Sequence, residues 1–341
     1  MSKNDSRTRA FETVNNKGFK SNKSRQKLVI AIFVVIILIL LAFATLIIGQ
    51  IINKVGPRPT LPGPSNDNIT YIPKDAGDVK IGNLLFISDK YQYEFSGDFS
   101  NMINIKNYQR SSENVAQTEI NGLYTYSLAA DRIALDKTAL EAFNLMVLDY
   151  CKTLDLSGAK ENSASNIIIA WGGYSEDTVH EYETDVKDIG KDYYDHAIGT
   201  ALTLKVYSPS TVITETILKQ DYTWIYENAH KYGYIIRFPD GCSDHTGFDS
   251  SKRIHLRYVG VEHATYIYKN GLCLEEYLEL LHDYSVDNPL TFTGDNGNTY
   301  QVYYVAYSGN PTSVPVPKNN PYTISGDNMN GFIVTVENTI E

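Results

Sequence analysis

The chain has 341 residues, of which 43% are hydrophobic and 21% are charged, and its formal net charge is −10. This length allows one well-packed domain with additions, but not three domains. The acidic balance argues against nucleic acid as a partner.

The chain begins with a basic tail and an apolar segment. Residues 1–27 carry eight basic and two acidic side chains without hydrophobic periodicity, so we expect a disordered tail. Residues 28–52 are almost purely apolar and long enough for one transmembrane helix. Because the basic excess precedes this segment, we expect the N-terminus in the cytoplasm and the remainder outside a plasma membrane.

The next segments are a linker and the main domain. Residues 53–78 contain five prolines and are predicted to form an extended linker. Residues 79–285 mix helical and strand patterns, which favours an α+β fold. A helix is expected over residues 139–154, where Leu140, Phe143 and Val147 share one face. Further helices are expected at 224–232 and 275–283, and strands at 84–88, 166–171, 201–207, 234–238 and 254–259.

Residues 286–341 are predicted to form a small β appendage. Asn296-Gly297 lies between the alternating segments 290–293 and 299–307, and this pattern predicts a hairpin. Residues 313–317 and 331–336 are expected to add β segments.

Three cysteines follow the apolar segment: Cys151, Cys242 and Cys273. Their number is odd, and their spacing is not that of a metal site. Cys242 and Cys273 are candidates for a disulfide in an oxidising exterior, with thiols buried by packing as the alternative. The sequence leaves their bonding open.

Two motifs resemble those of the VanY-type zinc D-alanyl-D-alanine carboxypeptidases, which are bacterial cell-wall peptidases. The family segment Ser-x-His-x-x-Gly-x-Ala-x-Asp is matched at His196, Gly199 and Ala201. The family segment Glu-x-Trp-His is matched at His255, which precedes Leu-Arg-Tyr-Val-Gly. The resemblance spans about residues 139–278. It implies a VanY-like α+β core with a small antiparallel sheet and flanking helices, and it makes His196 and His255 candidate zinc ligands.

Three positions depart from the family pattern. Thr203 stands where an aspartate ligand is expected, and Lys252 stands where the glutamate base is expected. Tyr174, or Ser175 in the other alignment, stands at the arginine that binds the substrate carboxylate. Threonine is a poor zinc ligand, and a charged lysine cannot accept a proton. The resemblance therefore implies the fold but argues against catalysis.

A rebuilt metal site remains an alternative. The interval from Thr246 to His255 is one residue longer than is usual in the family, and a one-residue shift exchanges the faces of a strand. Asp249 is therefore a candidate ligand.

Asp195, Asp244 and His245 are further candidates, although Asp195 is more simply a surface acid and His245 a loop histidine. In the other interpretation, His196 and His255 are packed, hydrogen-bonded core residues. No cofactor is expected unless a rebuilt site holds zinc.

These observations predict a membrane-anchored pseudo-enzyme at the outer face of a bacterial plasma membrane. It would bind a peptidoglycan stem peptide or an envelope protein. One alternative is an active zinc D,D-carboxypeptidase with displaced ligands. Another is a tethered structural subunit of an envelope complex that uses its tail as a cytoplasmic contact.

Overall fold

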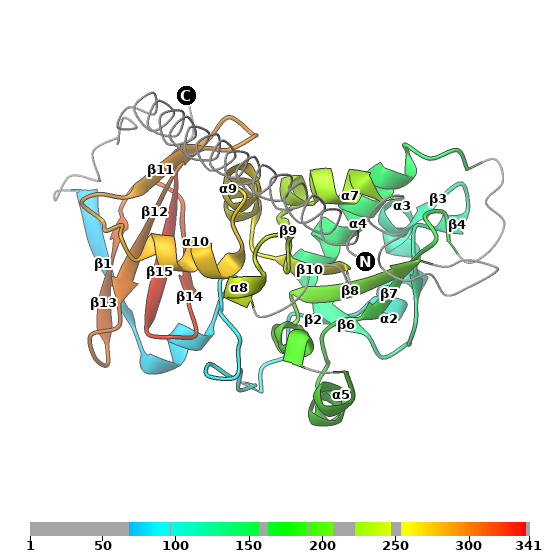
Figure 1. The fold of residues 1–341 in the computed structure, drawn as a ribbon, viewed down its shortest axis with the longest axis horizontal. Helices are drawn as coiled ribbons and strands as arrows, with labels where there is room; N and C mark the ends of the chain where they lie inside the picture. Colours follow the sequence, from blue (N-terminus) through cyan, green and yellow to red (C-terminus); the bar gives the residue numbers. More distant parts are fainter. Residues whose placement is uncertain are drawn as a thin grey trace, which may run out of the picture. The chain divides into compact units, whose positions relative to one another are not determined.

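Five strands form the central sheet, in the order β5-β7-β8-β10-β9. Figure 1 labels β7, β8, β9 and β10 of this sheet. The computed structural model describes residues 68–95, 97–156, 163–189, 191–206, 222–246 and 254–338. The short β5 pairs with β7 in parallel, and the other neighbours are antiparallel. The strands are β5 (Ser127–Leu128), β7 (Ile167–Trp171), β8 (Ala201–Val206), β10 (Ile254–Tyr258) and β9 (Tyr234–Ile236). The strands predicted at 166–171, 201–207, 234–238 and 254–259 are confirmed within these bounds.

Helices and short 3-10 turns, the latter labelled η, pack around this sheet and around the C-terminal sheet. They are η2 (Ala76–Lys80), α2 (Ile105–Arg110), η3 (Ser112–Asn114), α3 (Val115–Thr118), α4 (Lys137–Cys151), η4 (Val179–Glu181), α5 (Tyr182–Ile189), η5 (Lys191–Ile198), α7 (Thr223–Asn228), η6 (Ala229–Tyr232), α8 (Ser243–Thr246), α9 (Val261–Asn270) and α10 (Leu274–Leu281). The small strand pairs are β2 (Met102–Asn104) with β6 (Ala134–Asp136), and β3 (Glu119–Ile120) with β4 (Leu123–Tyr124).

Helix α4 supplies much of the main core. It begins two residues earlier than predicted because the Asp136 side chain accepts hydrogen bonds from the Thr138 and Ala139 amides at 2.9 and 3.2 Å. The predicted apolar stripe is buried together with residues of β7, β8 and β10. Phe143 meets Tyr126 and Tyr234 edge-on, which is a favourable arrangement of aromatic rings.

The C-terminal residues form a four-stranded antiparallel sheet in the order β11-β12-β15-β14. Its strands are β11 (Leu290–Thr293), β12 (Thr299–Ala306), β14 (Tyr322–Gly326) and β15 (Gly331–Asn338). The predicted hairpin joins β11 to β12, and Gly297 adopts the left-handed conformation (φ 83°) that its turn requires. Val302 and Ile333 share an apolar cluster with α9 and α10. The appendage is therefore packed onto the rest of the fold.

The predicted linker ends earlier than residue 78. Strand β1 (Ile69–Lys74) pairs with β13 (Thr312–Pro317) in a separate two-stranded sheet, and both strands contain proline. Proline lacks an amide donor, but the edge of a sheet tolerates it. Residues 69–74 are extended, as predicted, but residues 76–78 belong to the 3-10 turn η2, and the pairing with β13 was not predicted.

The strand predicted at residues 84–88 is wrong. Leu84 and Leu85 are buried, as their apolar character requires, but the segment has no strand partner. The guanidinium of Arg257 instead donates to the carbonyls of Asn83 and Leu85, at 3.0 and 3.2 Å. A side chain thus satisfies the backbone groups that a neighbouring strand would otherwise bind.

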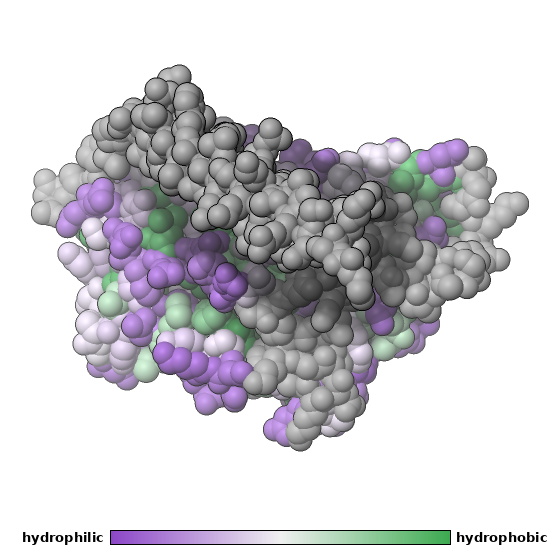
Figure 2. Space-filling model, viewed as in Figure 1, coloured by the Kyte–Doolittle hydropathy of each residue, from purple (hydrophilic) through white to green (hydrophobic). Residues whose placement is uncertain are grey.

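On the face shown in Figure 2, hydrophilic and hydrophobic residues are interspersed where the surface is coloured, and the hydrophilic ones are more extensive. This is expected where the apolar side chains are gathered into internal clusters. The predicted membrane span at residues 28–52 and the tail before it lie outside the described residues. Among the helices that are described, none has both the length and the apolar character needed to cross a bilayer.

Candidate functional site

The candidate site is built on the ladder between β8 and β10. Thr203 on β8 is the direct partner of His255 on β10 and also pairs with Trp171 on β7. Directly opposed residues in an antiparallel pair place their side chains on the same face of the sheet. The register therefore brings together two positions that are far apart in the sequence.

The turn before β8 adds His196 to this pair. His196 lies in η5, and its carbonyl accepts a hydrogen bond from the Gly199 amide at 3.0 Å. Gly199 has φ of 74°, and a Cβ atom on Gly173 would lie only 2.7 Å from its Cα. These close-packed glycines allow the end of β7 to meet the turn that carries His196.

The Thr203 hydroxyl lies between the two histidines. Its Oγ1 is 3.3 Å from Nε2 of His196 and 3.3 Å from Nδ1 of His255. The imidazole ring centroids are 4.8 Å apart, and no more than 2% of any of the three residues is exposed. The sequence motif thus correctly brought His196, Thr203 and His255 together.

The ring nitrogens that lie against Thr203, Nε2 of His196 and Nδ1 of His255, are the nitrogens that would face a metal ion. A hydroxyl has one proton, so Thr203 donates to one ring nitrogen and is able to accept an N–H from the other. A histidine nitrogen that carries a proton has no lone pair for a metal. The hydrogen-bonded pair and a metal-bound pair are therefore competing states of the same atoms.

Burial lowers the pKa of His255 well below its usual range, and the nearby His196 lowers it further. The ring of His255 is consequently neutral near pH 7. A neutral ring suits the hydrogen bond to Thr203 and costs less to bury than a charged one.

A buried ion cluster lies beside the histidines. Asp195 Oδ2 accepts from Arg237 Nε at 2.7 Å, and Asp195 Oδ1 is 3.4 Å from Arg257 Nη1. Arg237 also forms a bidentate pair with Glu275, at 2.7 and 2.9 Å. Burial alone would raise the pKa of Asp195, but the attraction of the two arginines outweighs it and holds the pKa below its usual range.

The interpretation of Asp195 as a surface acid is therefore wrong. It is 3% exposed, and both of its oxygens face arginines. Its sequence neighbourhood gave no sign of this because the two arginines come from β10 and from the residue that follows β9. Because both of its oxygens already interact with arginines, the Asp195 carboxylate is a poor candidate for a metal ligand.

Tyr174 lies three residues after the end of β7 and is 5% exposed. Its hydroxyl donates to Asp185 Oδ2 at 2.9 Å, and Arg132 binds the same oxygen at 2.9 Å. Arg132 also contacts Glu181 at 3.0 Å. Sequence matching did not find this arginine, which comes from another part of the chain and is held by two acids. The neighbouring Ser175 bonds with Thr178 through its hydroxyl, at 3.1 Å.

The other candidate ligands do not join His196 and His255. Asp244 is exposed on α8, and Nε2 of His245 lies 3.3 Å from Glu276 on α10. Asp249 and Lys252 lie outside the described residues. In the described part of the chain, a single group of three or more Cys, His, Asp or Glu side chains converges closely enough to hold a metal, and it contains neither histidine of the site.

Comparisons with known proteins identify the family. The model of the VanY D-alanyl-D-alanine carboxypeptidase matches residues 173–261. A D-alanyl-D-alanine carboxypeptidase of Enterococcus faecium is 30% identical over 258 residues, which cover 75% of each chain. The chain belongs to the VanY family.

Two further similarities agree with the VanY assignment. A D-alanyl-D-alanine carboxypeptidase of Enterococcus faecalis is 51% identical over 57 residues, covering 17% of this chain and 21% of the relative. The solved D,D-dipeptidase VanXYg, in complex with a D-Ala-D-Ala phosphinate analogue, has a TM-score of 0.59 at 21% identity, with 79% of this chain and 99% of that chain covered. This second similarity shows a common fold.

The described residues do not fit the zinc site that membership of the VanY family implies. His196 and His255 supply two nitrogen donors, but the third position is the hydroxyl of Thr203. Catalytic zinc sites use three strong ligands and keep one open position for water. A neutral hydroxyl is a poor third ligand and leaves the charge of the zinc ion uncompensated.

Proposed function

We propose that this chain is a non-hydrolytic VanY-family protein that binds a peptidoglycan stem peptide. The observation that carries the proposal is the position of Thr203, whose hydroxyl bridges His196 and His255 where the family pattern has a zinc-binding aspartate. The frame of the family site is kept, while its metal-binding charge is missing. Peptide binding is carried over from the relatives, which are named D-alanyl-D-alanine carboxypeptidases.

Tyr174 supports the same proposal. At this position the family resemblance places an arginine for the substrate carboxylate, whereas here a tyrosine hydroxyl donates to Asp185. A guanidinium binds a carboxylate through two charged hydrogen bonds, which one phenol cannot reproduce. A bound peptide would consequently be held with less dependence on a free C-terminus.

The proposal also places the protein at the outer face of a membrane. The basic tail and the apolar segment at residues 28–52 support a single membrane anchor with the family domain outside the cell. From there the domain would reach cell-wall peptides or a neighbouring envelope protein.

The test is release of D-alanine from a peptide ending in D-Ala-D-Ala, with zinc supplied to the purified chain. We expect no release above background, because the loss of a positioned general base alone costs roughly 10²- to 10⁴-fold. Binding of the uncleaved peptide is measured in parallel by calorimetry.

Zinc-dependent release that is sensitive to a chelator and lost in His255→Ala would overturn the non-hydrolytic proposal. It would favour the alternative of an active D,D-carboxypeptidase with displaced ligands, such as Asp249. Absence of both release and binding would favour an envelope protein as the partner instead of the stem peptide.

A further inference from the structure

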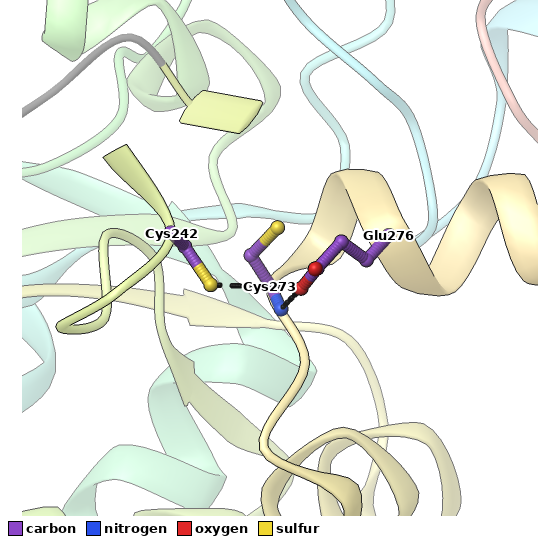
Figure 3. Close-up of side chains that lie close together, drawn as sticks. All are labelled: Cys242, Cys273 and Glu276. Carbon is purple, nitrogen blue, oxygen red and sulfur yellow. Dashed lines mark hydrogen bonds between the residues drawn. The ribbon is translucent and has the colours of Figure 1, made fainter. Parts of the chain in front are cut away.

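Two cysteines and a glutamate converge at a place separate from the two site histidines (Figure 3). The sulfur atoms of Cys242 and Cys273 and a carboxylate oxygen of Glu276 all lie within 4.8 Å of one another. The Cys242 thiol donates to Glu276 Oε2 at 3.6 Å, and the same oxygen accepts from the Cys273 amide at 2.9 Å. Both cysteines are free and buried.

A fourth group with ligand chemistry adjoins this cluster. Nε2 of His245 lies 3.3 Å from the second oxygen of Glu276, Oε1. The Glu276 carboxylate thus contacts a thiol through one oxygen and an imidazole through the other. The four side chains together offer two sulfurs, one nitrogen and one carboxylate oxygen.

The local structure explains how four such groups meet. Cys242 immediately precedes α8 and His245 lies within it, while Cys273 is the N-cap of α10 and Glu276 lies in its first turn. Residues three apart on a helical turn lie on the same side. Each pair therefore presents two ligand atoms in one direction, and the contact between α8 and α10 brings the pairs together.

We propose that Cys242, His245, Cys273 and Glu276 form a binding site for one zinc ion. Zinc favours four-coordinate sites with thiolate, imidazole and carboxylate ligands. Two thiolates on one zinc lie roughly 3.8 Å apart, because each Zn–S bond is about 2.3 Å long. The ligand atoms of Cys242, Cys273 and Glu276 lie within 4.8 Å of one another, which is close to this spacing. His245, whose Nε2 lies 3.3 Å from Glu276, would have to move toward the two sulfurs to become the fourth ligand.

This site differs in chemistry and position from the family site. Its ligands come from α8, the residue before it, and α10, whereas His196 and His255 belong to η5 and β10. The proposed site links α10 to the segment that follows β9, next to the ion pair between Arg237 and Glu275. The zinc ion would therefore stabilise the fold beside the peptide site, independently of whether the chain hydrolyses peptides.

A disulfide between Cys242 and Cys273 is the competing state of the same sulfurs. A disulfide would involve neither Glu276 nor His245. Yet Glu276 contacts the Cys242 thiol, and His245 contacts Glu276. The presence of four ligand side chains at one place favours the metal.

The experiment titrates Co²⁺ into the purified full-length chain, kept reduced with a phosphine that does not bind the metal. We expect a near-ultraviolet thiolate-to-cobalt absorption that saturates at one ion per chain and is displaced by Zn²⁺. Cys242→Ser and Cys273→Ser should each abolish this absorption. Cys151→Ser is the matched control, because this buried thiol lies on α4 next to the Thr125 carbonyl, outside the cluster.

Glu276 and His245, the other two proposed ligands, are each tested against a control variant. Glu276→Gln and His245→Gln should weaken Co²⁺ binding by more than the roughly 10-fold that even outer-shell changes cost. Glu279→Gln changes an exposed acid one turn further along α10, and His180→Gln changes an exposed histidine on η4. Both controls should bind Co²⁺ as the parent chain does.

A second measurement needs no substitution and so does not depend on the folding of a variant. Zn²⁺ should slow alkylation of Cys242 and Cys273 at least 10-fold without changing that of Cys151, as followed by mass spectrometry. Equal alkylation with and without Zn²⁺ would overturn the proposal. A 242–273 disulfide in protein purified without reductant, combined with no thiolate absorption after reduction, would overturn it in favour of the disulfide.

Discussion

Thr203 and His255 are direct partners in the β8–β10 ladder, and their side chains meet at 3.3 Å between Oγ1 and Nδ1. A carboxylate at position 203 would face the same imidazole and would add a negative charge. The difference between a metal-binding and a hydrogen-bonded pair therefore depends on the side chain of one strand residue.

Replacing Thr203 by aspartate should create a zinc site with His196 and His255. The carboxylate supplies the third ligand and the missing charge. We expect one additional zinc per chain, measured by elemental analysis in a Cys242→Ser background that removes the proposed cysteine site. The control is the same variant with His255→Ala, which should lose the added zinc. Equal zinc content in all of these variants would contradict the prediction.

Replacing Asp195 by asparagine should destabilise the fold by roughly 3 kcal/mol, because it leaves the buried Arg237 and Arg257 without their shared counter-charge. Urea unfolding followed by circular dichroism measures the change. Asp244→Asn is the matched control on the surface and should change stability by less than about 0.5 kcal/mol. A small effect at Asp195 would mean that the arginines find other partners.

The pH dependence of stability should carry a contribution from His263. This residue is 3% exposed, and its ring nitrogens lie 2.7 Å from the Tyr277 hydroxyl and 3.0 Å from the Thr335 hydroxyl. Burial lowers its pKa, although the neighbouring Glu262 acts in the opposite direction. The folded state therefore binds this proton less readily than the unfolded state, whose histidine pKa is about 6.5.

The contribution of His263 is present above about pH 6.5 and is lost as the pH falls below that value. The loss is at most about 1.4 kcal/mol per pH unit for one group. Urea midpoints at several pH values should show a shallower dependence in His263→Gln than in the parent chain. His282→Gln, at an exposed histidine, should keep the parent dependence. An unchanged slope in His263→Gln would show that His263 does not contribute.

The C-terminal sheet should be required for the stability of the family domain. A chain ending at Ser285 loses Val302 and Ile333 from the cluster with α9 and α10, so its melting temperature should fall. The single change Ile333→Ala should cost about 2–5 kcal/mol, the usual range for such buried truncations. Ile81→Ala, at a residue that is 60% exposed, is the matched control. A melting temperature unchanged by removal of the sheet would show an independent module.

The sequence predicted elements with strong local signals better than contacts between distant ones. The stripe on α4 and the Asn-Gly turn before β12 are local patterns, and both were placed correctly. Motif spacing also brought His196, Thr203 and His255 together. The Asp195–Arg237–Arg257 cluster was missed because its members are joined only by the fold.

The cysteine cluster shows the same limitation. Cys242 with His245, and Cys273 with Glu276, are each three residues apart, but a count of cysteines alone did not reveal the mixed pattern. Including histidine and glutamate at that spacing would have singled out both pairs. Their meeting still depends on the contact between α8 and α10, which no local pattern predicts.

The pairing of β1 with β13 has a mechanical consequence. The register runs from Ile69 opposite Pro317 to Lys74 opposite Thr312, so the first described strand is fastened to a strand near the other end of the chain. Tension that enters the chain at Ile69 would load this short ladder before it reached the sheet that carries Thr203 and His255. The two-stranded sheet would then separate first, before the tension distorted the contact between Thr203 and His255.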